Sequence, residues 1–155
     1  MSIRTPPLLR TQAGAAAVEF ALVAATILLP LLFAMMEFGR VGFYWNAATE
    51  ATRLGARLAV VCNLDDASIR SRMTALFPVI TTADIKVVYE PGGCTVNSCL
   101  QVTVSIAKPT EVQTYNPFFN FSSLFPPFST TLPRESMRSA FGPAGAEVSN
   151  PVCSG

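Results

Sequence analysis

The side chains that most enzymes use for acid–base and nucleophilic chemistry are scarce in this chain. Its 155 residues include no histidine, which excludes a Ser-His-Asp triad, a Cys-His pair and a histidine metal site. No carboxylate pair or activated nucleophile stands out either. With a net charge of +1, the chain has no excess of basic residues to form the dense basic face that binding to nucleic acid requires. We therefore expect a protein without enzymatic activity, metal, cofactor or nucleic-acid partner.

Four cysteines could form covalent links: Cys62, Cys94, Cys99 and Cys153. In an oxidising compartment they would form two disulfides, for which three connectivities exist. Cys94 and Cys99 enclose a short loop between two strand-like runs, which favours a local bridge and leaves Cys62 to pair with Cys153. A four-cysteine zinc site is the alternative, although the cysteine spacing matches ligand spacing only loosely and an oxidising compartment disfavours thiols.

The apolar residues are concentrated in one segment. Half of the chain is apolar and 14% is charged, whereas ordinary soluble domains carry about 25% charged residues. Between Ala13 and Met36 the only charge is Glu19. At about 1.5 Å per residue, a helix of this length crosses a hydrocarbon core of ~30 Å. Arg4 and Arg10 precede the segment, and no acidic residue lies among residues 1–12. This excess of positive charge predicts that this end stays in the cytoplasm.

The alternative to a retained membrane helix is a cleaved signal peptide. Its apolar region would be about 7–15 residues long and would end in a small-x-small site, whereas here Met36-Glu37-Phe38-Gly39-Arg40 follows. We expect the helix to continue, because residues 39–61 contain no proline and repeat small or apolar residues at helical spacing. These small residues would allow either another helix or the protein's own domain to pack closely against this part of the helix. Within the span, Pro30 should kink or locally unwind the helix.

The residues after Cys62 predict a small domain of α+β class. Acids at 65–66 and Pro78 bound a short helix from about 66 to 77. Alternating patterns predict strands at 85–89 and 100–106, with a third strand from about 130 to 141 in which Pro133 marks an edge. The expected architecture is an antiparallel sheet packed against the distal half of the long helix.

Two further segments show no regular pattern. Residues 116–128 are rich in phenylalanine and carry no charge. They could cover the core, lie at the membrane surface or contact another subunit. The tail, residues 142–155, is rich in Gly, Pro, Ser and Ala and is expected to be irregular.

The segment Gly14-Ala15-Ala16-Ala17-Val18-Glu19-Phe20 resembles the processing region of prepilins and pseudopilins of the tight-adherence (Tad, type IVc) pilus. In these proteins a prepilin peptidase cuts after a glycine, and Glu-Phe or Glu-Tyr then occupies the fifth and sixth mature positions. The resemblance implies cleavage between Gly14 and Ala15. Glu19 and Phe20 would then be the fifth and sixth mature residues.

A second stretch narrows the resemblance to TadE-like minor pseudopilins. It comprises Glu37, Phe38, Gly39 and Arg40, then Tyr44 and Asn46-Ala47, then Ala51-Thr52-Arg53-Leu54-Gly55-Ala56-Arg57. The resemblance covers about residues 10–61. It implies a cleaved leader at 1–14, a transmembrane and assembly helix at 15–38, an extracytoplasmic continuation at 39–61 and a periplasmic α+β domain at 62–155.

The function that this resemblance implies is biogenesis or composition of a Tad pilus used for adhesion. The N-terminus would be cytoplasmic and the C-terminal domain periplasmic, with a single pass through the inner membrane and possible transfer into an extracellular pilus. The implied partners are the prepilin peptidase, other Tad pilins and pseudopilins, the inner-membrane assembly platform and membrane lipid. The alternative is an uncleaved, membrane-anchored envelope protein whose outer domain binds a ligand or partner.

Glu19 has two interpretations. The simpler one places its carboxylate at the level of the cytoplasmic headgroups, where its cost is low. In the other, cleavage leaves an ammonium on Ala15, and Glu19 of a neighbouring subunit pairs with it. That pairing would fix the axial register between helices in a filament, as a single buried polar residue does in a coiled coil.

Overall fold

The computed structural model describes residues 13–107 and 127–154. Its contacts divide the chain into two units, Met1–Gly39 and Arg40–Gly155. Each unit is described in turn. The predicted leader, residues 1–14, and the Phe-rich stretch, residues 116–128, lie outside the described residues except for their last two positions.

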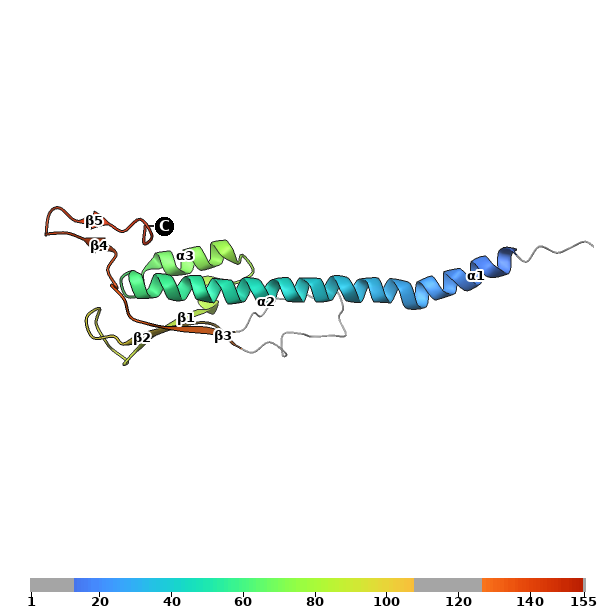
Figure 1. Ribbon diagram of the computed structural model, residues 1–155, viewed down its shortest axis with the longest axis horizontal. Coiled ribbons are helices and arrows are strands. Elements are labelled where there is room, and N and C mark those ends of the chain that lie inside the picture. Colours follow the sequence, from blue (N-terminus) through green and yellow to red (C-terminus); the bar gives the residue numbers. More distant parts are fainter. Residues whose placement is uncertain (1–12, 108–126, 155) are drawn as a thin grey trace, which may run out of the picture. The chain divides into compact units, whose positions relative to one another are not determined.

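The first unit is helical throughout its described part. Helix α1 spans Ala13–Val23, a π-helical turn spans Ala24–Leu28, and helix α2 spans Leu29–Val61, which continues into the second unit. The expectation of one long helix ending near residue 61 is confirmed. Figure 1 labels α1 and α2 along this helix.

The π turn is the local unwinding expected near Pro30, because it comes directly before that residue. The N–H of Leu29 donates to the carbonyl of Ala24, five residues back, where an α-helix would use four. The hydroxyl of Thr26 donates to the carbonyl of Leu22 at 2.7 Å. A proline ring clashes with the carbonyl four residues before it, and a widened turn relieves that crowding.

The second unit packs a three-stranded sheet and one further helix on the second half of α2. Helix α3 spans Ala67–Leu76, and a short 3₁₀ turn at Thr82–Asp84 leads into β1, Ile85–Glu90. Strands β2, Gln101–Ile106, and β3, Phe128–Pro133, complete an antiparallel sheet of order β1-β2-β3 (Figure 1). The predicted α+β class, the helix near 66–77 and the first two strands are confirmed.

The core lies between α2, α3 and one face of the sheet. In the centre strand every second side chain is buried, namely Val102, Val104 and Ile106, and register places Val87 and Thr130 on either side of Val104. From α3 come Ile69 and Met73. The small residues of α2 face this core. The buried members are Ala48, Ala51, Thr52, Gly55, Ala56 and Ala59.

The small-residue stripe of α2 therefore packs against its own domain, which decides between the two alternatives left open by the sequence. One polar link crosses this contact. The hydroxyl of buried Thr52 donates to the carbonyl of Thr49 at 2.9 Å and accepts from the hydroxyl of Thr130 at 3.2 Å. Burying a hydroxyl without hydrogen-bond partners costs free energy. Here Thr49 and Thr130 supply the partners of the Thr52 hydroxyl.

The third strand differs from its expected range of 130–141. It begins at Phe128 and ends at Pro133, because proline has no N–H to continue the ladder. The next residues leave the sheet and bond to the end of α2, where Met137 N–H and Arg138 N–H donate to the carbonyls of Val60 and Val61. The expectation that the tail is irregular is also wrong in part, because β4, Ala140–Phe141, pairs with β5, Val148–Ser149.

Candidate membrane and assembly helix

The helix from Gly14 to Val61 is long and apolar enough to cross a membrane. None of its most apolar window is buried within the protein, and its large side chains from Val18 to Met36 are exposed. Apolar surface exposed around a whole helix requires a lipid or protein environment outside the chain. This segment is therefore the candidate functional surface of the first unit.

The predicted processing and register residues lie in α1. A Cβ added at Gly14 would meet no atom within 4 Å, so the position is open to an approaching protein. Ala15 and Glu19 are four residues apart and share a helix face. None of the ion pairs in the described part of the chain includes Glu19. Phe20, beside it, is exposed.

The predicted family-motif residues Glu37 to Arg40 lie in α2 at the junction of the two units. Glu37 and Arg40 are half-buried and Phe38 is exposed. A Cβ at Gly39 would meet nothing within 4 Å. This part of the motif therefore places one large apolar side chain and one open glycine on the helix surface.

The motif residues 53–57 face two different environments. Arg53 forms an exposed ion pair with Glu50, with Nη1 and Oε1 2.9 Å apart, and Arg57 is exposed on the same face. Gly55 is buried instead. A Cβ there would clash with Sδ of Met73 and would lie 3.1 Å from Cγ1 of Val104. Gly55 therefore serves the packing of α3 and β2 on the helix, which sequence spacing alone did not reveal.

Aromatic side chains meet where α2 enters the domain. The rings of Phe43 and Tyr44 are 5.9 Å apart, and Tyr44 is 6.0 Å from Phe77, directly after α3. Trp45 meets Phe128, the first residue of β3, edge to face at 5.1 Å. The contact between Tyr44 and Phe77 joins residues far apart in the chain, so local sequence patterns give no sign of it.

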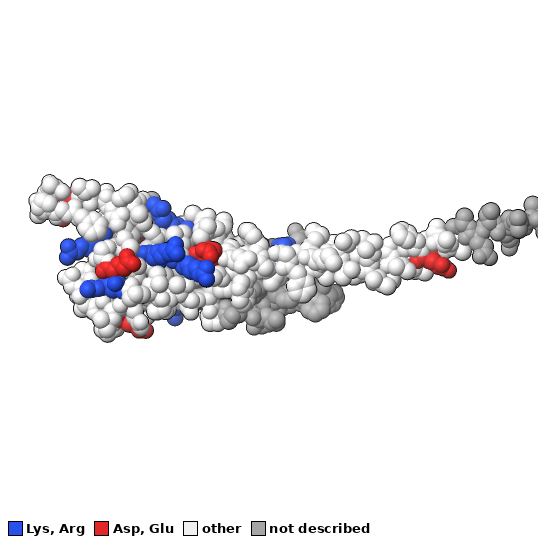
Figure 2. Space-filling model, in the orientation of Figure 1, with Lys and Arg blue, Asp and Glu red and all other residues white. Residues whose placement is uncertain are grey.

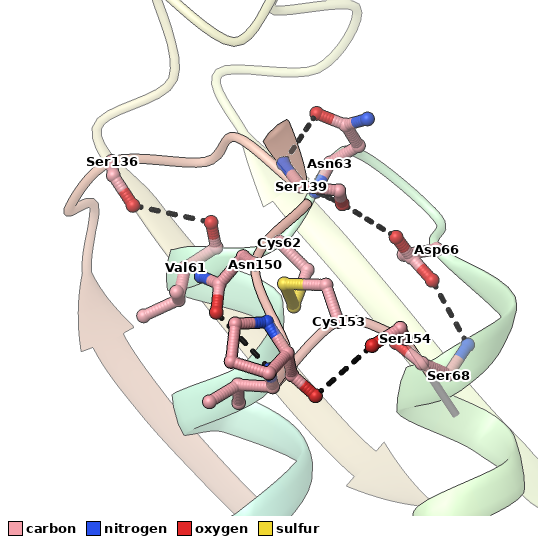
Figure 3. Close-up of a disulfide and its surroundings, with 12 residues drawn as sticks. Val61, Cys62, Asn63, Asp66, Ser68, Ser136, Ser139, Asn150, Cys153 and Ser154 are labelled. Atoms are coloured by element: carbon pink, nitrogen blue, oxygen red, sulfur yellow. Dashed lines mark hydrogen bonds between the residues drawn. A yellow bond between two sulfur atoms is a disulfide. The ribbon is translucent and has the colours of Figure 1, made fainter. Parts of the chain in front are cut away.

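The opposite end of α2 is fixed by the first disulfide (Figure 3). Cys62 pairs with Cys153, and Cys94 pairs with Cys99, which confirms the pairing that the sequence favoured. With all four sulfurs in disulfides, the zinc alternative is wrong. Hydrogen bonds from Ser136 to the Val61 carbonyl and between Asn63 and Ser139 support the same junction.

Asp66 links this junction to the start of α3. Its carboxylate accepts from the Ser68 N–H at 3.0 Å and from the Ser139 hydroxyl at 2.6 Å (Figure 3). Burial by itself would raise the pKa of Asp66, but these hydrogen bonds from Ser139 and Ser68 outweigh it and lower the pKa. Nearby, the Tyr89 hydroxyl accepts from the Asp65 N–H, and burial raises the pKa of Tyr89.

The described residues contain no group of three or more His, Cys, Asp or Glu side chains that could hold a metal ion. What the structure brings together is a packed domain at one end of α2 and an uncovered apolar surface along the other part of the helix.

Comparison with known proteins agrees with this arrangement. The family model of TadE-like proteins matches residues 14–57, a range that begins at the predicted processing glycine and ends at Arg57. No curated protein and no solved structure matches the chain. The chain therefore carries a TadE-like segment at residues 14–57, and the resemblance inferred from its sequence is confirmed.

Proposed function

We propose that this chain is a minor pseudopilin that takes part in biogenesis or composition of a Tad pilus used for adhesion. The observation that carries the proposal is the apolar helix, which matches TadE-like proteins from Gly14 onward and leaves its span uncovered by the protein's own domain. Such a helix can lie in a bilayer before assembly and among other pilin helices afterwards. The chain contributes packing surfaces and no catalysis.

The proposed life cycle begins in the inner membrane, with the N-terminus in the cytoplasm and the second unit in the periplasm. Its basic leader favours that orientation, and two disulfides suit an oxidising compartment. A prepilin peptidase removes residues 1–14. The assembly platform then brings the processed chain to other Tad pilins and pseudopilins.

N-terminal sequencing of the membrane-bound protein tests the processing step. We expect the mature chain to begin at Ala15. Gly14→Val should stop cleavage, and the open surroundings of Gly14 mean that this loss would come from the peptidase and not from misfolding. Gly39→Ala is the matched control, because it changes an equally open glycine in the same helix and should be processed normally. An intact leader in cells with active peptidase would contradict the proposal.

The assembly step is tested with Glu19→Ala. We expect this variant to insert and to be cleaved at Ala15 but to be depleted several-fold from sheared pili, because the new ammonium loses its carboxylate partner. Glu50→Ala removes an exposed surface carboxylate and should assemble like the natural chain. Normal incorporation of Glu19→Ala would rule out the register role while leaving the processing result intact.

A further inference from the structure

The bond proposed for processing, between Gly14 and Ala15, lies inside a helix, because α1 spans Ala13–Val23. In an α-helix the carbonyl of Gly14 accepts the N–H of Val18, and the adjoining residues wind tightly around the same axis. A peptidase needs the opposite arrangement, with a carbonyl carbon that water can attack and a chain that it can hold on both sides. The helical form of this bond therefore resists cutting.

In the described part of the chain, only backbone hydrogen bonds hold the turn that contains this bond. We call residues 14–17 the processing turn. They are one glycine and three alanines, whose side chains neither donate nor accept hydrogen bonds. All four residues are exposed, and a Cβ added at Gly14 would meet no atom within 4 Å. On the face in view, Figure 2 shows α1 as uncharged apart from an acidic side chain. Unwinding of the processing turn therefore breaks backbone hydrogen bonds and no side-chain hydrogen bond.

The residues of the processing turn differ in how strongly they favour a helix. Gly14 destabilises a helix by about 1 kcal/mol relative to alanine, because glycine loses the most backbone freedom there. The three residues that follow are alanines, which are the strongest helix formers. In the helical form the N–H of Ala17 donates to the carbonyl of Ala13, so this hydrogen bond spans the processing site. The helix is thus weakest at the bond and strengthened directly after it.

We propose that the processing turn must unwind before the prepilin peptidase cuts, and that Ala17 limits the rate of cutting by keeping this turn helical. The proposal rests on the processing step proposed above. Once unwound, the freed N–H and carbonyl groups pair with the peptidase as those of an added strand do. They need such partners because unpaired backbone groups are costly in an apolar environment.

The cut itself is a hydrolysis. The C–N bond between Gly14 and Ala15 breaks, and the oxygen of one water molecule joins the carbonyl carbon of Gly14. Both protons of that water end on the nitrogen of Ala15, so the products are a carboxylate and an ammonium. The peptidase supplies this chemistry, and the contribution of the chain to the rate is the free energy of unwinding.

Substitutions at position 17 test the proposal on the full chain in detergent. Ala17→Gly weakens the processing turn by the helix propensity of glycine, and Ala17→Ser weakens it less. Ala21→Gly is the matched control, because Ala21 is also an exposed alanine of α1 but lies outside the processing turn. Cleavage by purified prepilin peptidase is followed at a chain concentration far below KM. Amide hydrogen exchange at Val18, measured without peptidase, reports the unwinding directly.

We expect Ala17→Gly to be cut about fivefold faster than the natural chain, and Ala17→Ser about twofold faster. Hydrogen exchange at Val18 should accelerate in the same order. Ala21→Gly should leave both rates nearly unchanged, because the processing turn keeps its sequence.

Faster exchange without faster cleavage in Ala17→Gly would overturn the proposal, since unwinding would then not limit processing. Unchanged exchange in that variant would overturn it too, because Ala17 would then not hold the turn. Faster cleavage of Ala17→Gly with slower cleavage of Ala17→Ser would assign the effect to the size of the side chain that the peptidase accepts, again contradicting the proposal. If neither the natural chain nor any variant is cut after Gly14, the processing step itself fails, and the proposal with it.

Discussion

At the scale of single residues, Gly55 shows how tightly the second unit is packed. It sits where α2, α3 and β2 meet, and the nearest atoms to an added Cβ belong to the buried side chains of Met73 and Val104. Close packing leaves no room for even one extra methyl group without movement of neighbours. A glycine is required at position 55 because these side chains approach the helix closely. Its backbone conformation does not require a glycine, since it is that of an ordinary α-helix.

Gly55→Ala should therefore destabilise the folded domain. Overpacking costs about 1–3 kcal/mol, which exceeds or offsets the gain of up to about 1 kcal/mol from the better helix propensity of alanine. Gly42→Ala in the same helix is the matched control, because a Cβ there meets nothing within 4 Å. We expect its thermal midpoint in detergent to be unchanged or raised, and that of Gly55→Ala to be lowered.

A double-mutant cycle identifies the atom responsible. If the Sδ of Met73 causes the clash, the cost of Gly55→Ala should largely disappear in a Met73→Ala background, since residues in contact are not additive. An undiminished cost in that background would show that the clash with Met73 is not the cause.

At the scale of elements, the start of α3 depends on Asp66. Its carboxylate caps the helix by accepting the Ser68 N–H, and replacement of an N-cap residue by alanine costs about 1 kcal/mol. The Ser139 hydroxyl donates to the same carboxylate, so the cap also ties α3 to the segment after β3. The start of α3 is therefore stabilised by the ionised carboxylate of Asp66, in addition to the packing of Ile69 and Met73 in the core.

This cap makes the stability depend on pH. The pKa of Asp66 is lowered in the folded protein from its ordinary value of 3.8, so the ionised form stabilises the fold above that value. The stabilisation is lost as pH falls through the lowered pKa. We expect Asp66→Asn, which keeps a capping oxygen, to lose less stability than the natural chain when pH falls from ~6 to ~2. Identical losses in thermal denaturation would contradict this role.

Sequence patterns predicted the elements better than their junctions. The helix to residue 61, α3 and strands β1 and β2 follow from local periodicity and capping residues. The end of β3 at Pro133 also has a local cause, yet its start at Phe128 depends on pairing with Ile106. The Ser139 bond to Asp66 joins residues 73 positions apart. The role of Gly55 likewise depends on Met73, which no spacing rule connects to it.

At the scale of the whole molecule, the two disulfides make unequal contributions. Cys62–Cys153 closes a sequence separation of 91 residues, and Cys94–Cys99 a separation of 5. In the chain-entropy description, a bridge stabilises by restricting the unfolded chain, by about 4.6 kcal/mol for the longer loop and about 2.2 kcal/mol for the shorter one. Both figures are upper values, because the unfolded chain retains some structure.

Removing the long-range bridge with Cys62→Ser and Cys153→Ser should lower the thermal midpoint more than removing the local bridge with Cys94→Ser and Cys99→Ser. The cysteine pairs serve as controls for each other, because both replace two sulfurs by oxygens. The measurement is thermal denaturation of the full chain in detergent without reductant. A larger loss from the local pair would show that loop length does not set the contribution.

The long-range disulfide also changes what a protease can do to this protein. Cys62 lies at the end of α2 and Cys153 near the last residues described, so almost the whole domain sequence lies inside one covalent ring. A single cut anywhere in that ring leaves both fragments joined to α2. One cut between residues 62 and 153 therefore does not release the domain, and two cuts in that range are needed to shed a fragment.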